Sequence, residues 1–255
     1  MAWKCRSCGT QFTYLKPTLF CPHCGVGVQE EPETGERTQE WCYWCNNPLL
    51  PDADFCRNCG HRVGTSFDPG IETEAGSFVD ERDGRTYRTV RIGDQVWMAE
   101  NLDYGKMVPG KNGDLRVGEK WCFNDDESLG YGGLYTWKVA MESCPEGWHV
   151  PTQKEWDNLV KTLGGEIKAA WLLKSRTGWY KGFDGVDAVG FSALPSGAWR
   201  HREFDNLRGE GMARFWFSDP DRERNCLMMD IVMRVEIFSR AIENKYGYSV
   251  RCVKD

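Results

Sequence analysis

The chain has 255 residues, of which 40% are hydrophobic, and its formal net charge is −6. This length accommodates one small folded body and one of ordinary domain size. The mild negative charge argues against a polyanionic partner, and no apolar run approaches the ~18 residues that a membrane-spanning helix requires.

The N-terminal quarter of the chain is rich in cysteine. Eight of the 12 cysteines form four Cys-x-x-Cys pairs before residue 60, and a glycine follows three of these pairs. A two-residue gap lets both thiolates of a pair reach one ion, and two pairs complete the tetrahedron of a structural zinc site. Because so short a segment cannot bury a stabilising core, we expect metal binding to supply most of its folding free energy. The predicted ligands are Cys5, Cys8, Cys21 and Cys24 for one Zn²⁺ ion, and Cys42, Cys45, Cys56 and Cys59 for a second.

A disulfide framework is the alternative use of these cysteines, and it requires an exported protein. Residues Met1–Arg6 contain neither the apolar core nor the cleavage site of a secretory signal, so we expect a cytoplasmic protein. In residues 1–66, Asp and Glu slightly outnumber Lys and Arg, without the basic stripe of a nucleic-acid reader. We therefore expect the zinc-binding segments to be structural or to dock a second protein, with nucleic-acid binding as the less favoured alternative.

Two acidic stretches that contain Pro and Gly separate the predicted folded parts. Neither stretch has the apolar periodicity needed to pack, so both are predicted to be tethers. The predicted organisation is zinc ribbon 1 at residues 1–25, a linker at 26–40, zinc ribbon 2 at 41–63, a linker at 64–77 and the main domain at 78–255.

The main domain opens with two turn signals between β-prone segments. Asp83-Gly84 lies between Phe78–Asp80 and Tyr87–Ile92, and Gly93-Asp94 precedes Val96–Met98. Asp-Gly between such segments is a strong indicator of a β-hairpin. We therefore predict that paired strands begin this domain.

Two helices are predicted to follow these strands. Apolar residues with helical spacing indicate a helix over residues 134–144. Thr152 and Glu155 form the capping box of a second helix, which Gly164-Gly165 ends. The sequence thus predicts an α+β domain with two helices between terminal strands that can pair. Short strands are expected at residues 191–194, 198–199, 213–218, 227–238 and 248–253.

The main domain also carries a series of motifs. They are Val90–Asp103 (VRIGDQVWMAENLD), Leu134–Trp137 (LYTW), Cys144–Thr152 (CPEGWHVPT), Glu155-Trp156, Gly190–Gly197 (GFSALPSG) and Gly247–Asp255 (GYSVRCVKD). With these motifs the region 78–255 resembles the Fibrobacter succinogenes major paralogous domain, which belongs to the wider C-type-lectin-like and formylglycine-generating-enzyme-like group. The resemblance implies a C-type-lectin-like fold with two helices, short β-strands and a loop-rich half that presents a binding surface. It also implies a disulfide between Cys144 and Cys252, whereas a cytoplasmic location favours reduced thiols.

The same group includes oxidases and sulfur-modifying enzymes of the formylglycine-generating type. Such an enzyme needs a reactive cysteine pair close together in space, and neither Cys122 nor Cys226 lies in a closely spaced pair. The four histidines of the chain cannot be assembled into a catalytic triad or an iron site. We therefore expect a binding module and not an enzyme, with an oxidase or sulfur-modifying enzyme as the alternative.

The acidic loop at residues 124–127 offers the oxygen ligands that Ca²⁺ prefers. It lacks the glycine-punctuated spacing of an EF-hand, which favours a solvated loop instead. Sugar binding in lectin-like folds uses a Ca²⁺ site built from carboxylates, and no such set is evident in this sequence. The resemblance therefore implies a protein ligand more readily than a sugar.

The candidate binding residues lie in the expected loop-rich half, where aromatic and Arg side chains could anchor a ligand. The alternative is that Trp199 and Phe204 belong to the core and that the charged residues cover the surface. The candidate ligand-binding residues are Trp199, Arg200, His201, Arg202, Phe204, Asp205, Asn206, Phe217, Asp219, Arg222, Arg224 and Asn225.

Residues 199–244 hold most of the departures from the family pattern, and a near-standard terminal strand follows them. This arrangement resembles the variable proteins of diversity-generating retroelements, whose altered codons cluster just before a fixed C-terminus. Ordinary drift in a loop region is the alternative explanation, and the genomic neighbourhood would decide between the two.

Overall fold

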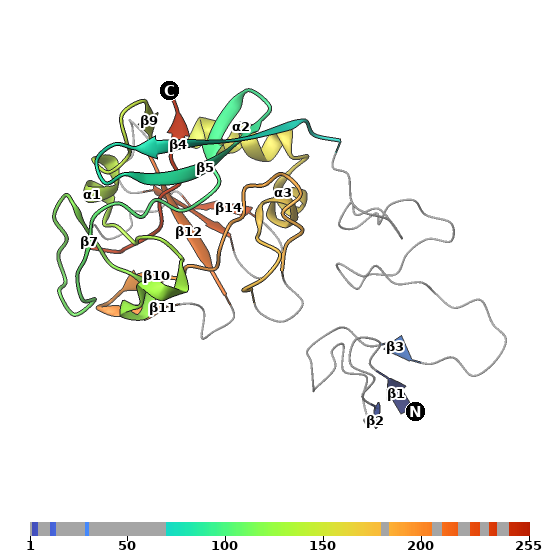
Figure 1. The fold of residues 1–255 in the computed structure, drawn as a ribbon. Coiled ribbons are helices and arrows are strands. Elements are labelled where there is room, and N and C mark those ends of the chain that lie inside the picture. The colour runs from blue at the N-terminus through green and yellow to red at the C-terminus, as the bar shows by residue number, and fades with distance from the viewer. Residues whose placement is uncertain are drawn as a thin grey trace. The chain divides into compact units, whose positions relative to one another are not determined.

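The computed structural model describes residues 70–179, 184–205, 211–218 and 245–255, together with the backbone of five strands outside these ranges. The chain divides into two compact units (Figure 1): residues 1–67 belong to the first, and residues 68–180 and 184–255 belong to the second. The eight cysteines predicted to bind zinc lie outside the described residues.

In the first unit, three short strands pair antiparallel in the order β2-β1-β3. Trp3 of β1 lies opposite Phe12 of β2 and Glu30 of β3. The strands are β1 (Ala2–Lys4), β2 (Gln11–Thr13) and β3 (Gln29–Glu30).

The second unit contains a five-stranded antiparallel sheet with the order β4-β5-β6-β15-β9. Val253 of the C-terminal strand lies opposite both Trp97 and His149, so the predicted pairing of the terminal strands is confirmed. The strands are β4 (Thr73–Asp80), β5 (Arg85–Ile92), β6 (Gln95–Met98), β9 (Trp148–His149) and β15 (Val253–Lys254).

The β4–β5 hairpin confirms the predicted Asp-Gly turn and corrects the predicted domain boundary. Gly84 has a φ of 73° and donates its backbone N–H to the carbonyl of Asp80 at 2.8 Å. β4 begins at Thr73, inside the stretch 64–77 that the sequence predicts to be a linker. Its Glu, Ala, Gly and Ser residues have low strand propensity, but pairing with β5 along the whole strand gives them a regular partner.

The helices are α1 (Trp137–Met141), α2 (Gln153–Thr162) and α3 (Glu166–Leu173). The capping box of Thr152 and Glu155 at the start of α2 is confirmed. α1 is shorter than predicted because Leu134 and Tyr135 instead form β-bridges to Trp121 and Tyr248. None of the helices among the described residues is long and apolar enough to cross a membrane.

The prediction of two helices is wrong, because the structure describes a third helix, α3, whose N-cap is Gly165. Gly164 and Gly165 have φ angles of 87° and 101°, so the double glycine that ends α2 also turns the chain into the next helix. Residues 169–173 of α3 are all buried. A helix that is apolar on nearly every side lacks the periodicity by which an amphipathic helix is predicted.

The remaining elements form small sheets and 3₁₀ turns. The strand expected at residues 191–194 is wrong, since Ala193 makes only an isolated bridge to Lys174. The expected strand at 227–238 is instead two antiparallel strands. The elements are β7 (Lys106–Met107), β8 (Glu119–Lys120), η1 (Phe123–Asp125), η2 (Glu127–Leu129), β10 (Ala198–Arg200), β11 (Glu203–Asp205), β12 (Ala213–Phe217), β13 (Asn225–Met229) and β14 (Val235–Phe238).

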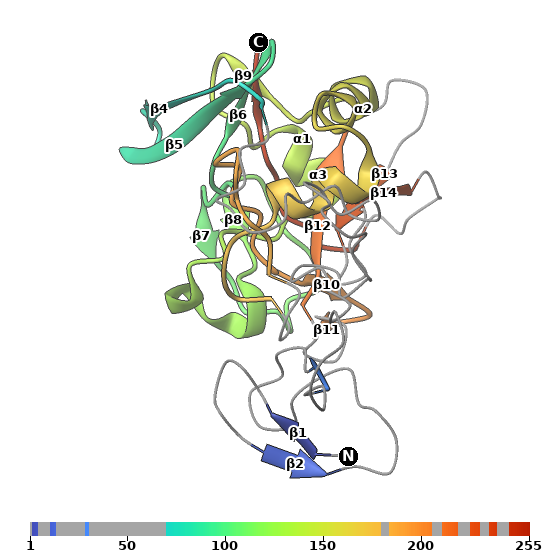
Figure 2. The same ribbon diagram turned by 90° about the vertical axis from the view of Figure 1, so that its right-hand side faces the viewer.

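The two ends of the second unit are built from different elements. The five-stranded sheet and α2 lie at one end, and the β10–β11 hairpin lies at the other, in both views of Figures 1 and 2. The described elements are thus of mixed α+β type, as predicted, with short strands and few helices. Loops, a hairpin and two 3₁₀ turns occupy the end away from the sheet, and the candidate binding residues of the β10–β11 hairpin lie there.

Candidate ligand-binding surface

The β10–β11 hairpin stands on a buried aromatic base. The ring of Trp199 stacks on Trp121, with ring centroids 4.1 Å apart and an interplanar angle of 22°. The indole Nε1 of Trp199 donates to the carbonyl of Gly110 at 3.0 Å. Trp199 is 2% exposed and Trp121 is fully buried. A stacked indole pair with a satisfied N–H fixes the position of the hairpin.

The second strand of the hairpin is fixed in the same way. Phe204 packs edge-on against Phe123, with centroids 5.8 Å apart. A Cβ atom on Gly110 would lie 2.7 Å from the Phe204 ring, so only glycine permits this close approach. Aromatic contacts from Trp121 and Phe123, which lie in one segment, therefore hold both strands of the hairpin, and the loop of Gly110 packs against both.

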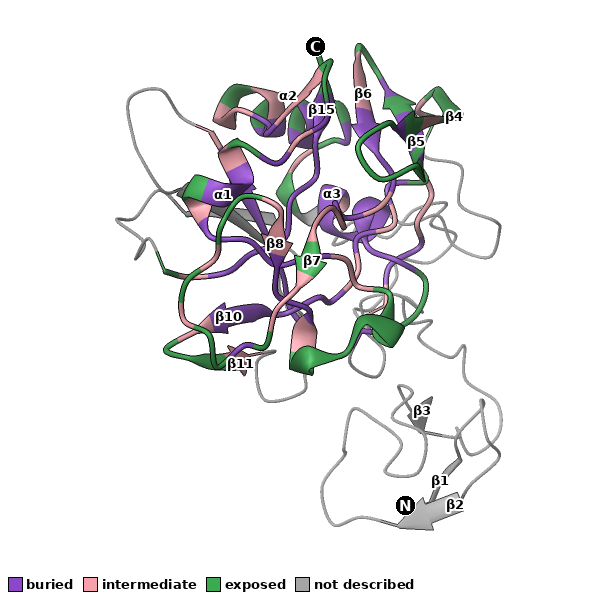
Figure 3. Ribbon diagram, turned by 60° about the vertical axis from the view of Figure 1, so that its left-hand side comes forward, coloured by how far each residue is buried: buried purple, intermediate pink, exposed green. Residues whose placement is uncertain are grey.

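The turn between β10 and β11 consists of His201 and Arg202, which are both exposed (Figure 3). Their φ angles are 52° and 69°. A two-residue hairpin turn of this kind needs positive φ at both central residues, and Asn-Gly is its usual sequence because most side chains are strained there. Closing the hairpin with His and Arg costs folding free energy. We therefore expect these two side chains to serve a role other than folding.

The hairpin is joined to the segment just before the C-terminal motif. Trp199 and Gly247 exchange backbone hydrogen bonds of 2.9 Å and 2.8 Å. This pairing brings Tyr246 beside the tip, where its hydroxyl lies 3.0 Å from Nε2 of His201 and the two rings meet edge to face. Sequence reasoning missed Tyr246. The aromatic residue directly before the Gly247–Asp255 motif was the available signal.

Charges on this surface are unevenly paired. Arg200 forms an ion pair with Asp205 and lies opposite Glu203 in the strand register. Arg202 and Lys245 are exposed, and neither forms an ion pair with any residue that the structure describes. We call His201, Arg202, Lys245 and Tyr246 the tip cluster.

The structure sorts the predicted binding residues into four groups. Trp199 and Phe217 are buried, with Phe217 fully so, and packing removes both from any contact with a ligand. Arg200, His201, Arg202, Phe204 and Asp205 are brought together on the hairpin. The backbone of Asn225 lies in β13. The predicted residues that lie outside the described part of the chain are Asn206, Asp219, Arg222 and Arg224.

The acidic loop at residues 124–127 uses its carboxylates to build its own turns. Asp125 accepts a hydrogen bond from the backbone N–H of Gly110 at 2.6 Å. Asp126 accepts from the hydroxyl of Ser128 at 2.6 Å and from its N–H at 2.9 Å; these two hydrogen bonds lower the pKa of Asp126, and the second caps η2. Within the described ranges, no group of three His, Cys, Asp or Glu residues is arranged to hold a metal ion.

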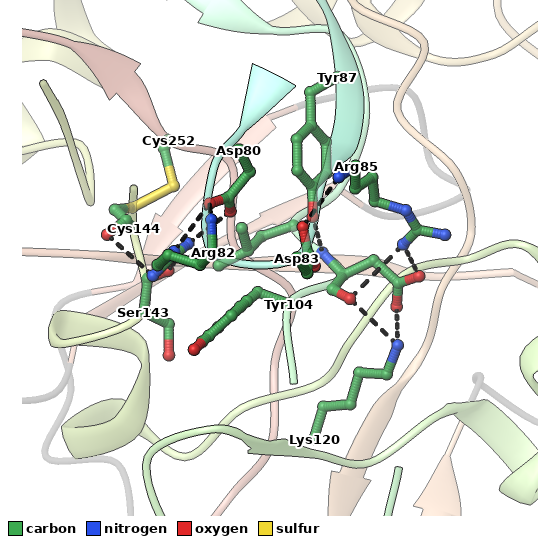
Figure 4. Close-up of polar contacts among 12 residues, drawn as sticks. Asp80, Arg82, Asp83, Arg85, Tyr87, Tyr104, Lys120, Ser143, Cys144 and Cys252 are labelled. Atoms are coloured by element: carbon green, nitrogen blue, oxygen red, sulfur yellow. Dashed lines mark hydrogen bonds and ion pairs between the residues drawn. A yellow bond between two sulfur atoms is a disulfide. The ribbon is translucent and has the colours of Figure 1, made fainter. Parts of the chain in front are cut away.

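A buried lysine connects this loop to the body of the unit (Figure 4). Lys120 is 4% exposed, and its Nζ lies 2.6 Å from Asp103 and 3.0 Å from Glu127. Arg85 forms an ion pair with the same Asp103. One carboxylate thus bridges two cations from different strands, which links β5 and β8 to the loop that supports the hairpin.

A second polar cluster ties the β4–β5 turn to the disulfide (Figure 4). Arg82 pairs with the buried Asp80 at 2.7 Å and donates to the carbonyls of Ser143 and Cys144. Burial raises the pKa of Asp80, but the hydrogen bonds and charge of Arg82 outweigh burial and hold that pKa below its usual value. Cys144 and Cys252 form a disulfide with a Cα–Cα distance of 6.1 Å, which joins the end of α1 to the C-terminal segment.

Cys122 and His149 are two further titratable residues whose surroundings bear on catalysis. Cys122 is buried, and burial raises the pKa of its thiol to about 11. His149 lies between Asp255, 2.6 Å from Nδ1, and Glu155, 2.9 Å from Nε2. Burial thus disfavours the thiolate of Cys122, and both ring nitrogens of His149 are engaged by carboxylates.

The family model of the Fibrobacter succinogenes major domain matches residues 90–254. The chain belongs to this family. The match extends from within β5 into β15, so the β10–β11 hairpin, Tyr246 and the Cys144–Cys252 disulfide all lie inside the Fibrobacter succinogenes major domain. No curated protein and no solved structure shows significant similarity to the chain. The function of the tip cluster therefore has to be argued from its own geometry.

Proposed function

We propose that the second unit is a C-type-lectin-like, non-enzymatic module that binds a protein ligand through the tip cluster and the hairpin residues around it. The observation that carries the proposal is the exposed His201-Arg202 turn, with two positive φ angles, on a base of buried aromatic rings. Exposed residues with a strained backbone on a rigid support are typical of binding sites. A rigid loop loses little conformational entropy when the ligand docks.

The surroundings of the tip also suit a protein ligand. Arg and Tyr are the residue types that most often dominate protein interfaces, and Arg202 and Tyr246 both reach the surface here. Phe204 is partly exposed and adds an apolar edge beside the charged turn. A partner could therefore bury a small apolar area and form charge-assisted hydrogen bonds at the same place.

The rival function is an oxidase or sulfur-modifying enzyme. Three features of the described residues favour binding over catalysis: the thiol of Cys122 is buried, Cys144 is bonded to Cys252, and His149 is held by two carboxylates. Copper or iron bound stoichiometrically by the purified protein would favour the enzyme instead.

For the first unit we propose two structural zinc ions and a role in docking a second protein inside the cell. This proposal rests on the spacing of the four Cys-x-x-Cys pairs. The further hypothesis of a retroelement-diversified segment at residues 199–244 rests on sequence alone and stays a prediction. A reverse transcriptase gene and a near-copy of this coding segment, differing mainly at template adenines, should lie beside the gene if it is right.

The binding proposal can be tested with the full chain as bait. Proteins captured by the wild type are compared with those captured by the double variant His201→Asn/Arg202→Gly, whose residues suit positive φ and preserve the turn. Lys161→Glu, an exposed charge reversal on α2 at the opposite end of the unit, is the matched control. At least one protein should be retained by the control and lost from the tip variant. If every captured protein is retained by the tip variant, this surface is not the binding site.

A further inference from the structure

The charges of the hairpin point to the chemistry of the ligand. Arg200 forms an ion pair with Asp205, and the exposed Glu203 lies opposite Arg200 in the strand register. Arg202 and Lys245 have no ion pair among the residues described, on a chain whose formal net charge is −6. Among the described side chains of the hairpin and the tip cluster, three cations stand against two carboxylates, which leaves a small positive charge on an acidic molecule.

The hydrogen-bond donors of the tip have a definite arrangement. When the Tyr246 hydroxyl donates to Nε2 of His201 across 3.0 Å, the proton of the neutral imidazole sits on Nδ1 and can be donated outward. The guanidinium of Arg202, the next residue, offers a planar fork of N–H donors that matches a carboxylate. His201 and Arg202 thus place two different hydrogen-bond donor groups on adjacent exposed residues of one turn.

We propose that the ligand of this surface is an acidic peptide segment, one of whose carboxylates is bound by His201 and Arg202 with the Tyr246 ring alongside; this inference rests on the proposed function. Lys245 then faces a second acidic residue of the same segment. A highly sulfated polysaccharide fits less well, because such a chain carries a charge at every few atoms, whereas Glu203 and Asp205 stand beside the cations of the hairpin.

The strained turn supports the same inference. Asn-Gly would close the hairpin without strain, yet the chain places at the tip the two residue types that together make a carboxylate site. At these two positions, the side chains proposed to bind the ligand therefore differ from those that would stabilise the turn most. Substitution by Asn-Gly separates the two roles, because it removes the donors and keeps the turn.

A random-peptide phage library is the probe, panned against the immobilised full chain. An enriched peptide is then synthesised, together with an analogue in which Asn and Gln replace its Asp and Glu, and binding is measured by fluorescence anisotropy at low and high salt. We expect enrichment in Asp and Glu. We also expect binding about 10-fold weaker or more for the amide analogue and for His201→Asn/Arg202→Gly, with Lys161→Glu unchanged. Affinity should fall as salt is added.

The other outcomes separate this inference from the proposed function. Peptides that are not acidic but are lost from the tip variant would keep the tip as a binding site and overturn the acidic ligand. Peptides that bind wild type and tip variant equally would overturn both. Heparin binding that depends on the tip, in the absence of acidic peptides, would identify an anionic saccharide and overturn the peptide. Failure to enrich any peptide counts against the inference as well.

Discussion

At the scale of single residues, Arg251 is the side chain on which the core of the second unit depends most. It is fully buried and lies over the ring of Phe191 at 4.4 Å. Its guanidinium donates to Asn101 at 2.8 Å and to the carbonyls of Met98, Phe191 and Ser192. Burial lowers its pKa to about 9, which reflects the loss of water around the cation. The acceptors around Arg251 would lose these hydrogen bonds if the cation were removed.

We therefore expect Arg251→Met to lower the free energy of unfolding by about 3 to 5 kcal/mol. Arg251→Lys should also destabilise, because an ammonium cannot reach four separated acceptors. Urea unfolding of the full chain, followed by tryptophan fluorescence, measures both. Arg88→Met is the control, since the Arg88 side chain is 63% exposed and should change stability by no more than about 0.5 kcal/mol. A loss below about 1 kcal/mol for Arg251→Met would contradict this account.

His149 predicts a pH dependence of stability. Burial lowers its pKa, but hydrogen bonds to Asp255 and Glu155 outweigh burial and raise that pKa above the usual 6.5. A raised folded pKa stabilises the protein fully below the unfolded pKa, and the gain is lost as pH rises through the folded pKa. Wild type should therefore lose more stability than His149→Gln between pH 6 and pH 8.5. The difference should stay below about 1 kcal/mol and shrink in high salt, because the site is partly exposed. Equal pH profiles would rule out this linkage.

At the scale of elements, different residues of the β10–β11 hairpin support its folding and its proposed binding role. The aromatic rings of Trp199 and Phe204 hold the hairpin, whereas His201 and Arg202 close it under strain. We expect His201→Asn/Arg202→Gly to raise the free energy of unfolding by about 1 kcal/mol, because both new residues adopt positive φ more easily.

Thermal unfolding of the full chain measures this gain. The control is His201→Ala/Arg202→Ala, which truncates the same side chains but keeps residues that disfavour positive φ, and it should give no gain. A lower unfolding temperature for the Asn-Gly variant would mean that the His201–Tyr246 contact stabilises the hairpin more than the strain weakens it.

At the scale of the whole molecule, the chain combines two units that we expect to be stabilised in different ways. The second unit buries a large aromatic core, whereas the first carries eight cysteines in pairs that the sequence predicts to hold zinc. Purified protein should contain about two zinc ions per chain, which atomic absorption measures. Cys21→Ser/Cys24→Ser should reduce the content to one. Cys122→Ser, which removes a buried thiol outside the paired motifs, should leave it at two. Thiols oxidised to disulfides in place of bound zinc would end this interpretation.

The sequence by itself determined the features that depend on near neighbours. The capping box of Thr152 and Glu155 is a contact between residues three apart, and the Asp83-Gly84 turn joins strands that follow each other directly. The ordered motifs determined the family for the same reason, since each is a local string of residues. The α+β class followed from these local elements.

Which candidate residues are exposed depends on contacts that form only when the chain folds. Trp199 is removed from the surface by Trp121, and His201 meets Tyr246, partners that lie far along the sequence and approach only after the chain has folded. α3 was missed because its burial on nearly every side leaves no periodic pattern to read, and β4 because its order comes from pairing with β5. Burial and pairing are properties of the neighbours that a residue acquires on folding, so the composition of a segment alone does not determine them.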